Sequence, residues 1–304
     1  MNLAEPLVSV IITTHGRLES LKLAIESVKN QTYKNLELIV VDDCSHDGTK
    51  QWMEFNELPN VIYHYISDKE SKGGNYARNY GVKLSSGSAV AFLDDDDVWD
   101  KEKIEKQIKL MNSDVGIVYC GMNRIFEDGS KIKVVPDNDY RGDLSKKVFD
   151  KIFCTTSMIM MNKKIFNAVG GFDEKLNFWQ EYDLLIRACQ VTKVNFVAEP
   201  LVDIMNAKSD PSRLTNKIDG WLKAVSYVNN KYNKKINELP IKSQKDRKLM
   251  IFNNAANRCY MSGDMKRRRY FLKQAWKVDY SLKHFIKYLL NVPNYKMQKI
   301  RSRF

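Results

Sequence analysis

The residues best able to do chemistry are four consecutive carboxylates, Asp94–Asp97, which directly follow the apolar run Ala89–Leu93. A short apolar run of this kind predicts a buried strand. Adjacent carboxylates repel one another and are rarely buried without partners. In open α/β sheets, ligands bind outside the carboxyl ends of the strands. The run therefore predicts either a cation-assisted ligand site or a solvated acidic loop in which Asp97 or Asp100 caps the next helix.

Polar residues also follow two other predicted strands. Val8–Thr13 leads into the loop Thr13–Arg17, and Leu36–Val41 ends in the pair Asp42-Asp43. Helical spacing of apolar residues between these strands predicts alternating strands and helices, which is typical of a parallel sheet with right-handed crossovers. The three polar strand ends then meet at one edge of the sheet, and this favours a ligand site.

Further elements follow from the same patterns. Past the second strand we expect strands at Val61–Tyr65, Gly116–Cys120 and Ser157–Met161, a helix at Asn75–Leu84, a hairpin joining Met122–Phe126 to Lys131–Val135, and a helix opening near Trp179. Helices are predicted near the C-terminus at Leu214–Tyr232, Ile241–Met261, Lys266–Val278 and Leu282–Leu290.

The charge of the 304-residue chain is unevenly distributed. Residues 1–205 hold 25 Lys and Arg against 31 Asp and Glu, whereas residues 206–304 hold 24 against six. The predicted domains are accordingly an α/β domain over 1–205 and a basic helical region over 206–304. Basic amphipathic helices suit an anionic membrane surface. A solvated helical bundle, packed on the core or on a second subunit, explains the charge as well. Nucleic-acid binding is disfavoured because no recognition motif accompanies the charge.

Composition bounds the location of the protein. No run of about 18 apolar residues predicts a membrane-spanning helix, and the first residues lack the pattern of a secretory signal. The five scattered cysteines match neither a disulfide framework nor a zinc spacing. These features predict a cytoplasmic protein, peripheral at the inner face of the cell membrane if the basic helices bind lipid.

Six motifs in order resemble glycosyltransferase family 2, over about residues 6–205. They are Val8–His15, Gln31–Ser45, Gly73–Gly81, Asp94–Asp97, Gly170–Glu174 and Trp179–Leu184. The resemblance implies a GT-A fold, which is a Rossmann-like, mostly parallel α/β sheet flanked by helices. It also implies an inverting enzyme that moves a sugar from a nucleotide-sugar, commonly a UDP-sugar, to a hydroxyl of a glycan or lipid-linked acceptor in cell-surface polysaccharide synthesis.

The same resemblance implies roles for individual residues. Asp96 and Asp94 would hold a Mn²⁺ or Mg²⁺ ion on the leaving diphosphate, where a divalent cation stabilises developing negative charge. The resemblance places the donor against the residues Thr13, His15, Arg17, Asp43, Asn75, Arg78, Asp94 and Asp95. Of these, Thr13, His15 and Asp43 would line the base pocket, Asp95 would contact the ribose, and Arg17 and Arg78 would lie near the phosphates.

Inversion needs one general base on the acceptor hydroxyl. The family usually places an Asp at the second position of an acidic pair here, but this chain has Gln180-Glu181. Glu181 keeps a carboxylate and is the predicted base, with Asp183 as the alternative.

Two other functions compete with this prediction. A nucleotidyltransferase that forms sugar nucleotides would share the general fold, but its first loop would be richer in glycine than Thr13–Arg17. A catalytically weakened sugar-nucleotide-binding protein would explain the altered Gln180-Glu181 pair. The sequence leaves the sugar, the linkage, the acceptor and the oligomeric state open.

Overall fold

The computed structural model describes residues 5–56, 58–206 and 218–291. The chain divides into two compact units, one of residues 1–145 and 153–207 and the other of residues 146–152 and 208–304. The sequence analysis placed residues 146–152 in the first domain, whereas this short segment packs with the basic helices of the second unit.

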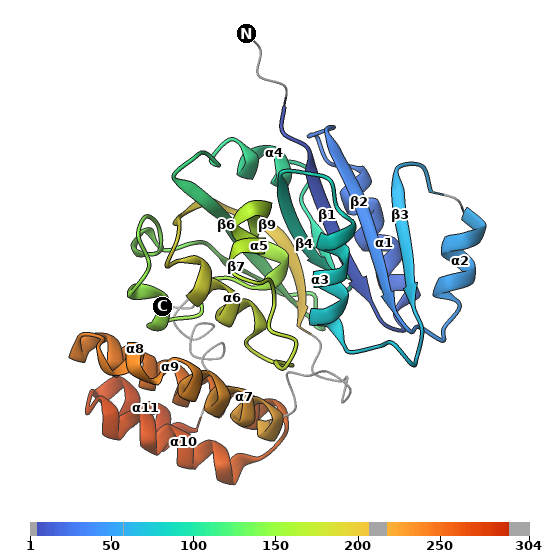
Figure 1. Ribbon diagram of the computed structural model, residues 1–304. Coiled ribbons are helices and arrows are strands. Elements are labelled where there is room, and N and C mark those ends of the chain that lie inside the picture. The colour runs from blue at the N-terminus through green and yellow to red at the C-terminus, as the bar shows by residue number, and fades with distance from the viewer. Residues whose placement is uncertain (1–4, 57, 207–217, 292–304) are drawn as a thin grey trace. The chain divides into compact units, whose positions relative to one another are not determined.

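A nine-stranded sheet is the centre of the first unit in the described residues, in the order β3-β2-β1-β4-β8-β6-β9-β5 with β7 beside β6 (Figure 1). Strands β3, β2, β1 and β4 are parallel to one another, whereas β8 runs antiparallel to both of its neighbours. The strands are β1 (Val8–Thr14), β2 (Leu36–Asp43), β3 (Val61–Ile66), β4 (Ala89–Asp94), β5 (Asp97–Trp99), β6 (Val115–Phe126), β7 (Lys131–Val134), β8 (Met160–Asn162) and β9 (Lys193–Asn206).

The register of the parallel strands brings the predicted polar ends together. Thr13 on β1 lies opposite Asp94 on β4, and Thr14 lies opposite Asp42 on β2. The interiors of β1 and β4 are fully buried, as expected for strands covered on both faces. The carboxyl ends of three adjacent strands therefore form one polar edge.

Helices flank this sheet, as predicted. The first unit contains α1 (Leu18–Lys29), α2 (Thr49–Asn56), α3 (Gly74–Leu84), α4 (Lys103–Ile108), α5 (Lys163–Ala168) and α6 (Gln180–Ala188). In the view of Figure 1, α3 and α5 lie in front of the sheet. Helix α3 packs on β1 and β2. A side chain at Gly81 of α3 would place its Cβ 2.5 Å from Ile11, so glycine is needed for this close approach.

Strand β9 is a finding that the sequence analysis missed. It pairs in parallel with β6 along its length and antiparallel with β5. Its pairing with β6 skips from Cys120–Val197 to Gly121–Pro200, so a bulge accommodates the proline. A Cβ at Gly121 would lie only 2.8 Å from the carbonyl oxygen of Glu199. A glycine in β6 therefore makes room for the bulge.

Two local predictions are wrong. Asp97 is not a helix cap, because it begins the short strand β5 and pairs with Ile204 of β9. The predicted strand Ser157–Met161 is instead a 3₁₀ turn, Thr156–Met158, followed by β8.

The second unit is helical, as the pattern predicts. Its described helices are α7 (Ile218–Lys231), α8 (Asn233–Asn237), α9 (Ile241–Met261), α10 (Met265–Val278) and α11 (Leu282–Leu290). The start of the helix expected from Leu214 lies outside the described residues.

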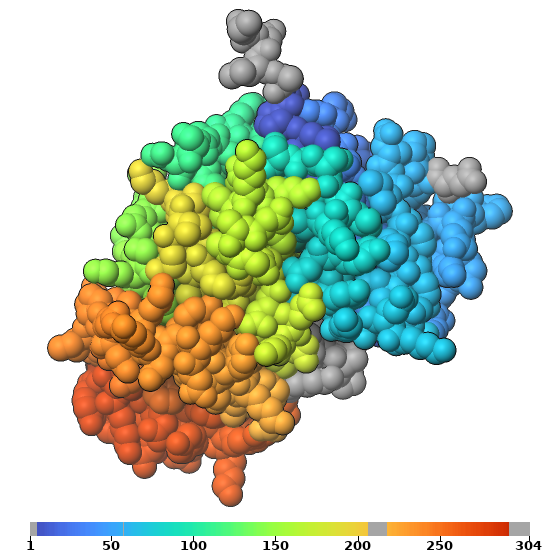
Figure 2. Space-filling view, viewed as in Figure 1, coloured from blue at the N-terminus to red at the C-terminus, as the bar shows by residue number. Residues whose placement is uncertain are grey.

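Arg247 of α9 is buried and donates to Asn229 of α7 at 2.8 Å and to the carbonyl of Phe149 at 3.5 Å. Phe149 belongs to the segment 146–152, so this arginine joins that segment to the helices. Figure 2 shows the side chains of these helices in orange and red.

Candidate functional site

Asp95 is the most deeply buried member of the acidic run. Its side chain is inaccessible, and it forms an ion pair with Arg17 through both carboxylate oxygens, with Arg17 Nε donating to Oδ2 at 3.1 Å. Burial raises the pKa of the Asp95 carboxyl to about 6, against the opposing effect of the Arg17 charge and of the hydrogen bond from Thr14. Arg17 precedes α1, so the loop after β1 supplies the cation that compensates this carboxylate.

The other two acids at the rim are partly exposed and also face arginines. Arg78 of α3 lies 2.5 Å from Asp94 Oδ1, and Arg17 lies 3.5 Å from Asp96 Oδ2. The side chains of Asp94 and Asp96 keep 29% and 27% of their surface exposed, whereas Asp95 keeps none. Consecutive acids therefore alternate between the rim and the interior.

Ser157 fixes both ends of the acidic run. Its hydroxyl oxygen accepts a hydrogen bond from the Asp94 backbone N–H at 3.0 Å and donates to Asp97 Oδ2 at 2.5 Å. Its carbonyl accepts the indole N–H of Trp99 at 2.9 Å. Ser157 and Asp97 are buried, so this hydroxyl sets the path of the turn between β4 and β5. The sequence analysis missed Ser157, because nothing local to it signals this distant contact.

The two acids at the end of β2 differ in their partners. Asp42 is fully buried and accepts hydrogen bonds from the Tyr63 hydroxyl at 2.8 Å and from the Ser45 backbone N–H at 2.9 Å. Asp43 is also buried, yet its Oδ1 has no hydrogen-bond partner among the described residues. A buried acceptor left open is costly unless a ligand completes it. Asp42 therefore stabilises the loop, and Asp43 has an oxygen available to a ligand.

Thr13 and His15 lie beside Asp43. Thr13 is buried at the end of β1, between β2 and β4. His15 donates from Nδ1 to the carbonyl oxygen of Asp43 at 2.5 Å. The structure thus brings together Thr13, His15, Arg17, Asp43 and the acids Asp94–Asp96.

Helix α3 connects this edge to the loop before α6. Asn75 is buried, and its amide donates to the carbonyls of Asp173 at 3.0 Å and Leu176 at 2.5 Å. One turn later, Asn79 exchanges two hydrogen bonds with the backbone of Phe172, at 2.8 and 2.9 Å. Arg78 lies between them, paired with Asp94. The two asparagines, which we call the α3 clamp, therefore hold the loop 171–176 to the helix that positions Arg78.

The predicted bases lie in the first turn of α6. Asp183 is fully buried and accepts hydrogen bonds from Arg187 Nε at 3.0 Å and Nη2 at 2.7 Å. Glu181 is half-buried and lies near Cys154, whose thiol pKa is raised by burial and by the Glu181 charge. Trp179 starts the helix with a left-handed backbone, φ 61°. Asp183 is thus held by the scaffold, whereas Glu181 lies on the more accessible side of the same turn.

The acidic rim fits a divalent cation bound together with a ligand, and it offers no complete cage of its own. In the described part of the chain, no three His, Cys, Asp or Glu side chains converge as a metal site would require. Mg²⁺ and Mn²⁺ favour carboxylate oxygens, and Mg²⁺ is usually held by one or two carboxylates, with substrate phosphates and water completing the shell. The partly exposed Asp94 and Asp96 match such a pair.

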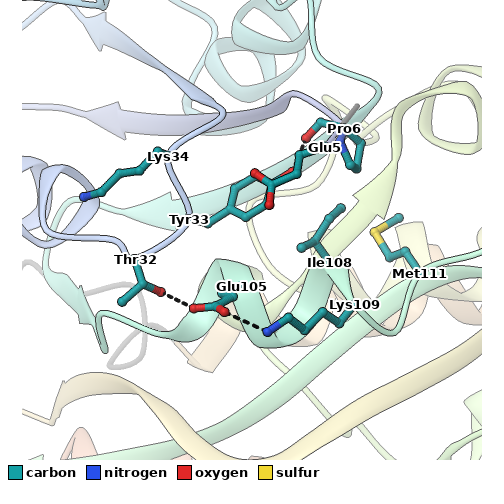
Figure 3. A pocket seen from close by; sticks show the side chains of 9 residues that line it. All are labelled: Glu5, Pro6, Thr32, Tyr33, Lys34, Glu105, Ile108, Lys109 and Met111. Atoms are coloured by element: carbon teal, nitrogen blue, oxygen red, sulfur yellow. Dashed lines mark hydrogen bonds and ion pairs between the residues drawn. The ribbon is translucent and has the colours of Figure 1, made fainter. Parts of the chain in front are cut away.

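A hollow in the described structure lies elsewhere. A pocket of about 580 Å³ lies where the chain enters β1 and β2, at the amino ends of these strands (Figure 3). Three of its polar side chains are paired with one another, since Thr32 donates to Glu105 at 2.6 Å and Lys109 pairs with the same carboxylate at 2.7 Å. The acids lie at the opposite ends of the strands, so we place the functional site there.

Comparison with known proteins assigns this arrangement to a family. The family model described as glycosyl transferase family 2 matches residues 9–170. An uncharacterised glycosyltransferase of Rickettsia typhi is 35% identical over 212 residues, which are 66% of this chain and 64% of the relative. The chain therefore spans slightly less than two thirds of that relative.

Two relatives have more informative names. The amylovoran biosynthesis glycosyltransferase AmsB of Erwinia amylovora is 30% identical, over 64% of this chain and 68% of its own length. The putative teichuronic acid biosynthesis glycosyltransferase TuaG of Bacillus subtilis is 33% identical, over 51% of this chain and 62% of its own length.

Solved structures show the same fold at low sequence identity. Residues 1–349 of TarS from S. aureus, in complex with UDP, superpose with a TM-score of 0.56 at 16% identity, covering 94% of this chain and 92% of TarS 1–349. The mannosyltransferase PcManGT of Pyrobaculum calidifontis, in complex with GDP-Man and Mn²⁺, gives a TM-score of 0.54 at 16% identity, covering 90% and 74%.

The raised pKa of Asp95 predicts a stability that depends on pH. The carboxyl titrates at about 6 in the native state against 3.8 in its reference state, so the native state holds more protons between these values. Its contribution to stability is therefore lost as pH rises through this window. The difference in free energy of unfolding, Asp95→Asn minus wild type, should therefore increase by about 2 to 3 kcal/mol from pH 4 to pH 7.

Urea unfolding of both proteins at the two pH values measures this difference. Asp47→Asn is the control, because its carboxyl titrates below this window and its difference from wild type should change little between pH 4 and pH 7. The hydrogen bonds of Thr49 and Leu18 lower the pKa of Asp47 and outweigh its partial burial, which acts to raise it. A difference between Asp95→Asn and wild type that does not change with pH would contradict the burial account.

The α3 clamp predicts protection of one loop. Asn79→Ala removes both hydrogen bonds to Phe172, and we expect amide exchange in residues 171–176 to accelerate about fivefold, which corresponds to the loss of about 1 kcal/mol. Asn79→Asp keeps the acceptor for the Phe172 N–H and should retain part of the protection. Lys83→Ala, at an exposed position of the same helix, is the control. Unchanged exchange in Asn79→Ala would show that the clamp does not hold the loop.

Proposed function

The chain belongs to glycosyl transferase family 2 and has the GT-A fold, and from this premise we propose that it transfers a sugar with inversion from a nucleotide-sugar to a hydroxyl of a glycan acceptor. One observation carries the proposal. Acids compensated by Arg17 and Arg78 share a sheet edge with Asp43, whose buried Oδ1 lacks a partner in the described structure. A ligand with a hydrogen-bond donor at one end and a diphosphate at the other complements this edge.

The donor would lie along the carboxyl ends of β1, β2 and β4. Asp43 Oδ1 would accept an N–H of the base, between Thr13 and His15. Asp95, expected at the ribose, is inaccessible and paired with Arg17 through both oxygens, so we assign it to positioning that arginine instead. The two arginines that now face carboxylates are the groups best suited to phosphate oxygens, because a guanidinium pairs with them bidentately.

We propose a role for Asn75 other than the predicted contact with the nucleotide-sugar. Both of its donated hydrogen bonds go to carbonyls of the loop before α6, so its amide is already used inside the protein. We assign Asn75 to positioning of that loop, together with Asn79, and we retain Arg78 of the same helix as a phosphate ligand.

Asp96 and Asp94 would hold Mn²⁺ or Mg²⁺ on the diphosphate. The cation supplies Lewis-acid stabilisation of the leaving group's negative charge. PcManGT is described with GDP-Man and Mn²⁺, which supports a divalent cation in this fold. Asp94 and Asp96 keep enough exposed surface to receive it, whereas Asp95 and Asp97 are buried by Arg17 and Ser157.

Glu181 would be the general base. Transfer with inversion needs a carboxylate that can take the proton of the acceptor hydroxyl as the bond to the sugar forms. Asp183, the alternative, is fully buried and bound twice by Arg187, so its oxygens serve the scaffold. The α3 clamp ties the loop before α6 to the donor edge, and this would fix Glu181 relative to the sugar.

The acceptor is proposed from the relatives. AmsB and TuaG are named for amylovoran and teichuronic acid biosynthesis, which favours cell-surface polysaccharide synthesis and a glycan or lipid-linked acceptor. TarS in complex with UDP favours a UDP-sugar donor. The comparisons lend no support to a nucleotidyltransferase.

Among the described residues, the structure has no helix with the length and hydrophobicity that a membrane-spanning segment requires.

The role of Glu181 makes a direct prediction. Glu181→Gln keeps the side-chain shape but cannot accept the proton, and we expect nucleotide release from saturating donor to fall about 10²- to 10⁴-fold. Donor affinity should change less than about twofold, because Glu181 is assigned to the acceptor side of the reaction. Stopped assays of nucleotide release and titration calorimetry measure these two quantities.

The matched control is Glu238→Gln, which makes the same change at an exposed position of the second unit and should leave both quantities unchanged. Glu181→Asp retains a carboxylate on a shorter side chain and should recover part of the rate. If Glu181→Gln releases nucleotide as fast as wild type, the base is another group.

A further inference from the structure

Helix α11 reverses the usual pattern of a helix in a folded unit. It exposes its leucines, with 71% of Leu282, 54% of Leu289 and 59% of Leu290 accessible. Its buried residues are His284 and Lys287, which are polar. A helix that packs on its neighbours normally buries the apolar stripe and exposes the charges. The leucines of α11 are therefore directed away from the described part of their own unit, whereas Phe285 and Tyr288 of the same helix pack on Trp276 of α10.

The exposed leucines form one face. Leu282, Leu289 and Leu290 are separated by seven and eight positions, which places them on the same side of an α-helix. Tyr280, just before the helix, is 75% exposed and extends this apolar surface along the chain. We call these four residues the leucine face.

The neighbouring helices behave differently. Helix α10, which packs on α11 and on α9, buries Phe271, Leu272 and Ala275. Helix α9 likewise buries Ala255, Ala256 and Cys259. Ile241 of α9 and Met265 and Tyr270 of α10 are also exposed, but in the described helices of this unit only α11 exposes several leucines on one face. A contiguous exposed apolar surface of this kind marks an interaction site.

The charge around the leucine face identifies its partner. Residues 241–290 contain 13 Lys and Arg but only three Asp and no Glu, and of these cations only Arg247, Arg268 and Lys287 are buried. Two of the acids are already paired, Asp264 with Arg267 and Asp279 with Lys245. From Tyr280 to Asn291 there is no acid, and Lys283 is exposed beside Leu282. Arg269 of α10 is also exposed and lies over the ring of Tyr288 of α11 at 5.4 Å, so exposed cations accompany the leucines on this helix.

We propose that the leucine face binds the surface of an anionic lipid bilayer, with α11 lying in the plane of the interface. The leucines and Tyr280 enter the boundary between headgroups and acyl chains, and the surrounding Lys and Arg contact the anionic headgroups. An interfacial helix needs this combination of an apolar face and a basic flank. The proposal concerns binding alone, so it does not depend on sugar transfer, and it brings the chain to where a lipid-linked acceptor would be found.

Vesicle flotation of the full chain tests the proposal. We expect wild type to float with vesicles of phosphatidylcholine that contain about 30% phosphatidylglycerol, and to remain unbound with pure phosphatidylcholine. The triple variant Leu282→Gln, Leu289→Gln, Leu290→Gln should lose at least about tenfold in bound fraction. Its matched control replaces Leu23, Phe55 and Val191 with Gln, because these apolar residues are equally exposed but lie in the other unit, and it should float like wild type.

Circular dichroism and nucleotide release in solution verify that each variant is folded and that the donor site is intact. A second variant, Lys283→Glu, changes only an exposed charge and should weaken binding to the anionic vesicles alone. Equal flotation with neutral and anionic vesicles would overturn the proposal, as would triple-variant binding that matches wild type. Light scattering that shows a wild-type dimer lost in the triple variant, without flotation of wild type, would assign the face to a second copy of the chain instead.

Discussion

The mutual repulsion of adjacent carboxylates is the constraint on which the rest of this structure depends. Four acids in sequence at the end of a buried strand are tolerable only if each carboxylate has a cation or a hydrogen-bond donor beside it. Arg17, before α1, faces Asp95 and Asp96, and Arg78, on α3, faces Asp94. The Ser157 hydroxyl donates a hydrogen bond to Asp97. The loop after β1, the helix α3 and the turn before β8 are thereby tied to one point. The site is built by the same contacts that make the acidic run foldable.

These contacts also suit the proposed chemistry. When a diphosphate binds with a divalent cation, its oxygens can pair with the arginines of the rim while the cation binds the carboxylates, so both partners of each ion pair gain a new contact. The buried Asp95–Arg17 pair would remain as the fixed part of the site. The α3 clamp then connects the same helix to the loop before Glu181. Donor and acceptor sides would be positioned by one rigid element, and such positioning lowers the entropic cost of reaction.

Local patterns were sufficient to predict much of this fold. The strands β1 to β4, the helix α3 and the ends of α9 and α11 follow from periodicity and turn residues. The strand β9 was missed because Pro200 and neighbouring acids hide its pattern, and only the bulge opposite Gly121 makes it a strand. Asp97 was misread for the same reason, because β5 exists only where β9 returns to pair with it. The site residues at strand ends could be found from the sequence, but Ser157 and Asn79 act through contacts with residues that are distant in the chain.

The central claim is that the acidic run is a cation-dependent diphosphate site, and a binding titration tests it most directly. Calorimetry of UDP, GDP and dTDP with wild type and Asp96→Asn, each with and without Mn²⁺, separates the possibilities. The account predicts that one nucleotide binds wild type tightly only with Mn²⁺, and that Asp96→Asn loses most of this gain. Binding that is equally tight without the cation, or that is unaffected in Asp96→Asn, would contradict it.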